Sequence, residues 1–279
     1  KRFLFSLSIM LCLSLILGAC NLPLAQQTAP PTPTSAMLPT PTPTESLPVI
    51  IEDIPDAEAH FAQADLALAF GDFAEALKLY SSSPPANTED YKAAALYGQA
   101  LTHYKSGDLY QARRSLDKLM ESYPHTLPGI RGNFLLGMIS DAEDQPEDAV
   151  HFYTSYINAQ PDILTAETWT RIGDSYTALK QYPEALSAYL TAWQVPSLSD
   201  KNSIGMKVAN AYQLTGETSK ALETYQQIYE NSSSIYTKSA ANLLAGRIEI
   251  ARGNTAEGYA YFQDSVNRFP ETYDAFSAL

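Results

Sequence analysis

Few side chains in this sequence could carry out chemistry. The two cysteines, Cys12 and Cys20, lie within the first twenty of the 279 residues, which excludes disulfides and cysteine metal sites from the rest of the chain. No Gly-rich phosphate loop, serine nucleophile elbow or His-Glu metal helix is present. The four histidines are scattered through the chain: His60, His103, His125 and His151. We therefore expect no catalytic residue, no metal site and no cofactor in these residues, and no enzyme unless a further domain lies beyond them.

The charge of the chain bears on its partners. Its 31 Asp and Glu outweigh 18 Lys and Arg, for a formal net charge of −13. Such a charge keeps a protein soluble, and it argues against nucleic acid, whose phosphates need a basic face. The carboxylates themselves suit helices: Glu143-Asp144 and Glu147-Asp148 lie at an expected turn and helix start, where the helix dipole favours acids.

The first nineteen residues have the organisation of a secretory signal. Lys1-Arg2 is positively charged, and the following residues 3–17 are apolar except for three serines. Leu17-Gly18-Ala19-Cys20 follows, and its small residues are typical of the cleavage site of a secretory signal. The apolar run is too short to cross a membrane comfortably. We assign residues 1–19 to a signal peptide.

The Leu-Gly-Ala-Cys tetrad resembles the lipobox of bacterial lipoproteins. The resemblance implies that Cys20 is the lipid attachment site, that cleavage precedes it, and that Cys12 is discarded. The chain would then be exported and lipid-anchored to the cell membrane or outer membrane, facing the envelope or the exterior. Two or more acyl chains make such anchoring stable. The alternative is an ordinary signal with a chance cysteine at the cut.

Residues 20–55 form a predicted linker. They are rich in Pro, Thr, Ala and Ser, including the run Pro39-Thr40-Pro41-Thr42-Pro43-Thr44. Such a composition buries too little apolar surface to fold, and dense proline keeps it extended at about 3.1 Å per residue. The linker could hold a domain roughly 100 Å from its membrane.

From Asp56 onward a self-similar unit appears. Its clearest form is the turn and helix of Gly71-Asp72 followed by Ala76, Leu77 and Tyr80. Small residues close this turn about every 36 residues, at Ala76, Ala112, Ala149, Ala185, Ala221 and Gly258. About twelve residues before each lies another, at Ala64, Ala100, Gly137, Gly173, Ala209 and Gly246. The spacing predicts helix hairpins that cross where neither helix has bulk, with an aromatic of each second helix filling the gap to the next hairpin.

These units resemble the tetratricopeptide repeat. The fourth unit matches best, with Trp169, Ile172-Gly173, Tyr176, Ala185, Tyr189, Ala192 and Pro196 in the family's order. The resemblance implies an all-α solenoid of about six helix hairpins over residues 56–279, with a right-handed superhelical twist. Residues 273–279 read as the opening of another first helix, so we expect the solenoid to continue beyond Leu279.

In this family, the groove of stacked first helices commonly holds a protein or peptide. By alignment, the groove positions are aromatic, apolar or basic at first and more polar later: Tyr97, Leu101, Tyr104, Arg131, Phe134, Met138, Thr170, Asp174, Thr177, Met206, Asn210 and Gln213. An exposed aromatic stripe indicates a partner site. The same residues could equally be core, because neighbouring repeats bury much of this surface.

We expect a cell-envelope lipoprotein that acts as a protein- or peptide-binding scaffold. The main alternative is the leading helical region of a peptidoglycan lytic transglycosylase, with peptidoglycan as ligand and the catalytic domain beyond Leu279. A second alternative is a factor that assembles outer-membrane or surface proteins. Repeats specify shape more than partner, so the sequence leaves these functions open.

Overall fold

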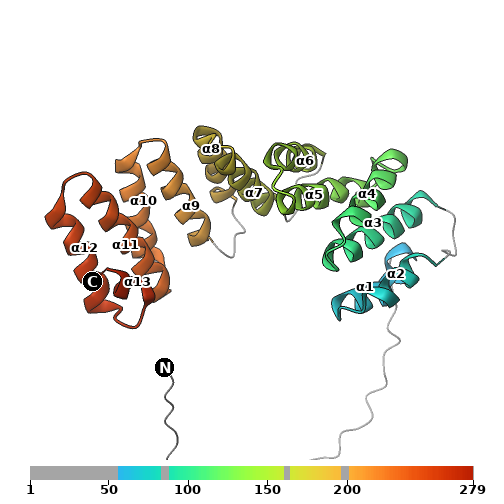
Figure 1. Ribbon diagram of the computed structural model, residues 1–279, viewed down its shortest axis with the longest axis horizontal. Helices are drawn as coiled ribbons and strands as arrows, with labels where there is room; N and C mark the ends of the chain where they lie inside the picture. Colours follow the sequence, from blue (N-terminus) through green and yellow to red (C-terminus); the bar gives the residue numbers. More distant parts are fainter. Residues whose placement is uncertain (1–55, 83–87, 160–163, 196–200, 279) are drawn as a thin grey trace, which may run out of the picture. The chain divides into compact units, whose positions relative to one another are not determined.

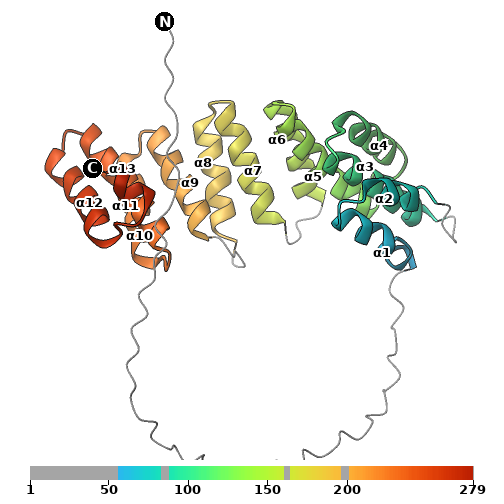
Figure 2. The same ribbon diagram turned by 60° about the horizontal axis from the view of Figure 1, so that its bottom comes forward.

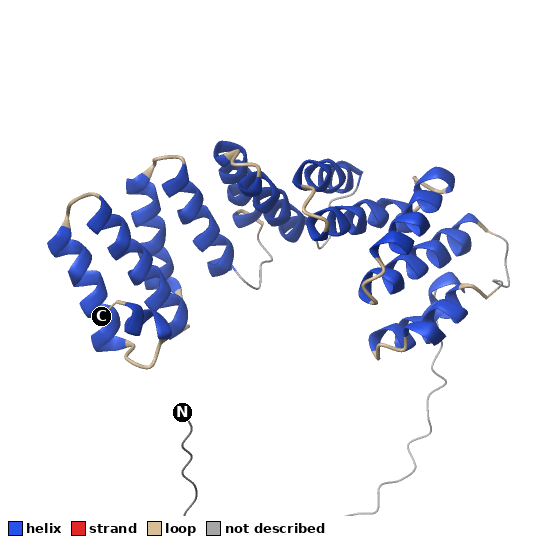
Figure 3. Ribbon diagram, viewed as in Figure 1, coloured by secondary structure: helices blue, strands red, loops and turns tan. Residues whose placement is uncertain are grey.

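The computed structural model describes residues 56–82, 88–159, 164–195 and 201–278. The predicted signal peptide, Cys20 and the linker lie outside the described residues. Within the described ranges the chain forms helices joined by loops and no strand (Figure 3). The helices are α1 (Asp56–Ala69), α2 (Phe73–Tyr80), α3 (Glu89–Lys105), α4 (Leu109–Ser122), α5 (Leu127–Ala142), α6 (Pro146–Ala159), α7 (Thr165–Ala178), α8 (Tyr182–Trp193), α9 (Lys201–Leu214), α10 (Thr218–Asn231), α11 (Ile235–Ala251), α12 (Thr255–Arg268) and α13 (Tyr273–Ser277).

Consecutive helices pair into hairpins that follow one another in chain order. The pairs run from α1–α2 to α11–α12, and α13 comes after the last of them (Figures 1 and 2). The extensive helix contacts join helices of one hairpin or of neighbouring hairpins. The predicted all-α solenoid of about six hairpins is confirmed. None of the described helices is long and apolar enough to span a bilayer.

A left-handed residue ends the first helix of every described hairpin. Glycine takes this place four times, at Gly71, Gly107, Gly216 and Gly253, with φ between 78° and 88°. The N–H of the next residue then donates to the carbonyl five residues earlier, as Asp72 does to Ala67 at 2.9 Å. The two units without glycine keep the same turn, because Asp144 (φ 57°) and Lys180 (φ 60°) adopt the left-handed conformation themselves.

The residue after this turn begins the second helix. Asp72 and Asp108 accept a hydrogen bond from the backbone N–H three residues on, at 3.1 Å and 3.0 Å. These carboxylates satisfy N–H groups that have no partner within the helix. The recurring Gly-Asp dipeptide therefore ends one helix and starts the next.

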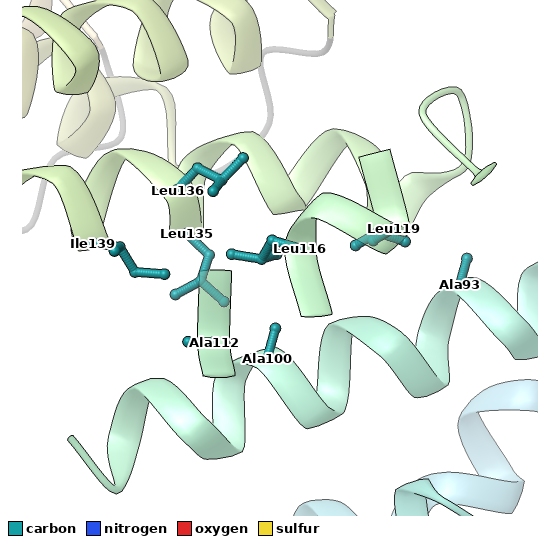
Figure 4. Close-up of a cluster of buried hydrophobic side chains, with 8 residues drawn as sticks. All are labelled: Ala93, Ala100, Ala112, Leu116, Leu119, Leu135, Leu136 and Ile139. Atoms are coloured by element: carbon teal, nitrogen blue, oxygen red, sulfur yellow. The ribbon is translucent and has the colours of Figure 1, made fainter. Parts of the chain in front are cut away.

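The core continues from each hairpin into its neighbour. Figure 4 shows one cluster, in which Leu116 and Leu119 of α4 lie between residues of α3 and α5. Its other members are Ala93, Ala100, Ala112, Leu135, Leu136 and Ile139, and every residue of the cluster is at most 3% exposed. A hairpin thus completes its core only with the next one in place.

The predicted close approach between small residues is seen at Gly246 and Gly258, whereas the role predicted for the aromatics was only partly right. In three hairpins the ring of the second helix packs on the glycine of its own first helix: Tyr153 on Gly137, Tyr189 on Gly173 and Phe262 on Gly246. Only a residue without Cβ leaves room for the ring at this distance. Tyr80 reaches the next hairpin as predicted, where its ring lies against Gly98.

Candidate binding site

A cavity of about 640 Å³ opens among the first helices α1, α3 and α5. Four helices contribute to its lining, since Tyr80 of α2 also reaches it. Its lining comprises Phe61, Asp65, Tyr80, Thr88, Asp90, Tyr91, Ala94, Tyr97, Gly98, Leu101, Leu127, Pro128 and Arg131. The volume falls within the range of ordinary ligand pockets.

Aromatic rings form the most buried part of this cavity. The ring of Phe61 lies 5.5 Å from that of Tyr80 and 6.4 Å from that of Tyr91, centroid to centroid. All three side chains are buried, whereas Tyr97 and Leu101 are half-buried and Leu127 is exposed. The cavity therefore has a rigid aromatic base and accessible apolar sides.

Three of the predicted groove residues meet in this cavity: Tyr97, Leu101 and Arg131. Sequence reasoning missed Phe61 and Asp65, which belong to the weakly matching first unit. A signal was present, because aligning Ala64 with Gly173 places Asp65 at the position of Asp174, a predicted groove residue.

The next predicted groove residues have packing roles. Phe134 lies 5.5 Å and 5.4 Å from the rings of Tyr153 and Tyr156. Tyr104 and Met138 pack against the core cluster of Figure 4. These three side chains are half-buried, which leaves part of each on the surface.

The remaining predicted groove residues, of α7 and α9, lie in different surroundings. The hydroxyl of Tyr189 donates to Asp174 at 2.7 Å and lies 3.1 Å from that of Thr177, so these three residues meet. Thr170, in contrast, is buried and its hydroxyl donates to a carbonyl of its own helix at 2.8 Å. Met206 packs against a core cluster of α9, α10 and α11, while Asn210 and Gln213 are exposed.

A tyrosine–aspartate pair recurs between the two helices of a hairpin. Tyr153 donates to Asp141 at 2.6 Å, Tyr189 donates to Asp174, and Tyr80 donates to Asp65. Burial, followed by the hydrogen bond to Asp141, raises the pKa of Tyr153 well above its ordinary value. The phenols remain protonated at neutral pH and act as hydrogen-bond donors.

A second cavity, of about 540 Å³, lies among α10, α11 and α12. Its lining carries four carboxylates, and partners within the chain already engage three of them, Glu230, Glu249 and Asp264. Asp264 accepts from Tyr229 at 2.7 Å and Asn242 at 2.8 Å, and it pairs with Arg268 at 2.8 Å. This cavity is consequently a weaker candidate than the first. Across the described ranges, no group of His, Cys, Asp and Glu could hold a metal ion.

The fold is that of a helical-repeat scaffold, in which the hairpins stack and their first helices lie in a row. The cavity described above opens among three of these first helices. Models of the tetratricopeptide repeat match residues 49–91 and 94–126. These two segments are tetratricopeptide repeats, and the hairpins that follow them have the same helical-repeat fold.

Solved structures share this fold. MamA covers 62% of this chain and 95% of its own, with 19% identity and a TM-score of 0.53. A putative kinesin light chain of Podosopora anserina with nearly identical TPR-like repeats covers 64% and 95%, with 15% identity and a TM-score of 0.52. RapI in its apo form covers 76% and 64%, with 15% identity and a TM-score of 0.57. No curated protein sequence matches the chain.

Proposed function

We propose that this chain is a lipid-anchored scaffold of the bacterial cell envelope that binds a polypeptide along its first helices. The cavity among α1, α3 and α5 supports this proposal most directly. It combines a buried aromatic base with half-buried Tyr97 and Leu101 and with charged residues, among them Arg131. Aromatic residues at the centre of a concave apolar site are typical anchors for a bound chain.

The anchoring part of the proposal depends on the N-terminal sequence. Cys20 follows Leu17-Gly18-Ala19 as in a lipobox, and the Pro/Thr-rich linker separates it from α1. The lipid would keep the scaffold at the membrane while the linker lets the groove reach a partner. Metabolic labelling with a clickable fatty acid tests this, since Cys20→Ser should lose the label and leave the membrane fraction. Retention of the label in this variant would contradict the assignment of Cys20.

Site-specific photo-crosslinking tests binding in the groove. A photoreactive phenylalanine at Leu127, an exposed residue of the cavity lining, should yield a protein adduct in living cells. Tyr110 of α4 provides a matched control, because it is 69% exposed but lies outside the cavity lining. Equal crosslinking at both positions, or none at Leu127, would reject the groove as the binding site.

A further inference from the structure

Two of the three tyrosine–aspartate pairs described above are completed by a cation from the next first helix. Arg171 of α7 lies 3.6 Å from Asp141, and Lys207 of α9 lies 2.5 Å from Asp174. The Lys207 ammonium also lies 5.7 Å from the centre of the Tyr189 ring. We call each of these contacts between neighbouring hairpins a joint. At both joints a carboxylate, an aromatic ring and a basic side chain form one polar contact.

The pair of Asp65 and Tyr80 lacks this cation. Arg171 and Lys207 each stand two residues before the small residue of their helix, which is Gly173 or Ala209. The same position on α3, two residues before Ala100, is Gly98. The ring of Tyr80 lies so close to Gly98 that a Cβ there would overlap it. No ion pair among the described residues includes Asp65, which is exposed.

The cavity occupies the space next to this incomplete pair. Gly98, Asp65 and Tyr80 all belong to its lining. Asp90 at the first turn of α3 adds a second exposed carboxylate, and Arg131 of α5 is the one basic residue in the lining. The half-buried Tyr97 and Leu101 offer apolar surface for an aliphatic stem. Lys and Arg place such a stem on apolar surface and keep the charged head at a polar rim.

We propose that the cavity takes a Lys or Arg side chain of the bound polypeptide. The positively charged end of this side chain pairs with Asp65 and Asp90. The ligand then supplies from outside what Arg171 and Lys207 supply at the other joints. This inference rests on the proposed function, because it names the chemistry of a partner in the same groove.

Matched peptides test the inference. Four fluorescein-labelled peptides of sequence Ser-Leu-Xaa-Leu-Ser differ only at the centre, which is Lys, Arg, norleucine or Glu. Norleucine keeps the apolar stem of lysine and lacks its charge. By fluorescence anisotropy with the purified chain, the Lys and Arg peptides should bind about tenfold more tightly than the norleucine peptide, as expected for a charge-assisted contact. The Glu peptide should bind most weakly.

Three variants of equal net charge separate this contact from general attraction to an acidic protein. Asp65→Asn keeps an oxygen that can accept from Tyr80 but removes the charge, so the advantage of the Lys peptide should disappear. Asp174→Asn removes the corresponding charge at a joint that Lys207 already fills, so that advantage should remain. Asp90→Asn, at an exposed position, should reduce the advantage in part and guards against a folding defect in Asp65→Asn.

The outcomes distinguish the two proposals. Equal binding of the Lys and norleucine peptides, or equal effects of Asp65→Asn and Asp174→Asn, would overturn the proposal that the cavity takes a basic side chain. The proposal that a polypeptide binds in the groove would remain. If none of the four peptides binds and Leu127 yields no crosslink in cells, the proposed function fails together with the inference.

Discussion

Single glycines determine how closely the helices of a hairpin approach. At Gly173 the ring of Tyr189 occupies the space that a Cβ would need, and both residues are buried. We expect Gly173→Ala to destabilise the protein by about 1–3 kcal/mol, the usual cost of overpacking. Chemical denaturation followed by circular dichroism measures this change.

Gly132 is the matched control for this prediction. It is also a buried glycine inside a helix, but its nearest neighbours would lie 3.2–3.5 Å from a new Cβ and are ends of flexible side chains. Alanine favours a helix over glycine by about 1 kcal/mol, so Gly132→Ala should be close to neutral or stabilising. Equal destabilisation by both substitutions would contradict the role given to the Tyr189 ring.

Tyr225 gives the protein a sensitivity to alkaline pH. Burial raises the pKa of this phenol from 10 to about 12. Below pH 10 the phenol is protonated in both the folded and the unfolded state. Between pH 10 and 12 only the unfolded state loses the proton, so the free energy of unfolding should fall by up to about 1.4 kcal/mol per pH unit.

Denaturant titrations from pH 8 to 12 measure this loss. Tyr225→Phe should reduce the slope above pH 10, and Tyr110→Phe, at an exposed position, should leave it unchanged. An identical slope in Tyr225→Phe and the unmodified protein would show that Tyr225 does not cause the loss.

At the scale of the helix hairpin, the turn is the most regular feature. The left-handed residue is glycine in four described hairpins and Asp144 or Lys180 in two. A non-glycine residue pays a conformational cost in this region. We expect Lys180→Gly to stabilise the protein by about 0.5–1 kcal/mol, since part of the gain is lost to the greater freedom of glycine in the unfolded chain.

The reverse substitution checks this expectation. Gly216→Ala places a Cβ at φ 84° and should destabilise by about 1–2 kcal/mol, although nothing lies within 4 Å of the new atom. Thermal melts of both variants give the comparison. Destabilisation by Lys180→Gly would mean that contacts of the lysine side chain outweigh the backbone cost.

Hairpins could be predicted from the sequence because their signals are local. Gly71-Asp72 marks a helix end and a helix start within two residues, and the small residues recur at a fixed spacing. Even the turns at Asp144 and Lys180 follow from alignment with the other units. The cavity depends instead on which side chain of one hairpin meets which residue of the next. The roles of Gly98 and Asp65 depend on how the side chains of neighbouring hairpins are aligned, which no local signal specifies. The sequence therefore predicted three residues of the cavity lining and missed its aromatic base.

Across the whole array, each hairpin contacts its neighbours and few other elements. A substitution that destabilises one hairpin should therefore also destabilise its neighbours, but not the distant hairpins. Ile172 is 2% exposed, and Ile172→Ala should cost about 2–5 kcal/mol. Hydrogen exchange should accelerate in α5–α9 far more than in α1 and α2. A uniform acceleration would show that the array unfolds as one cooperative unit.

The polar contacts between hairpins also make the hairpins non-interchangeable. Lys207 and Arg171 match a carboxylate on the preceding first helix, whereas Gly98 leaves its joint open. In a shuffled chain whose α9–α10 hairpin followed α1–α2 directly, Lys207 would face Asp65 as it now faces Asp174, and it would close the opening. The order of the repeats, and not only their number, then decides whether the cavity among α1, α3 and α5 is open.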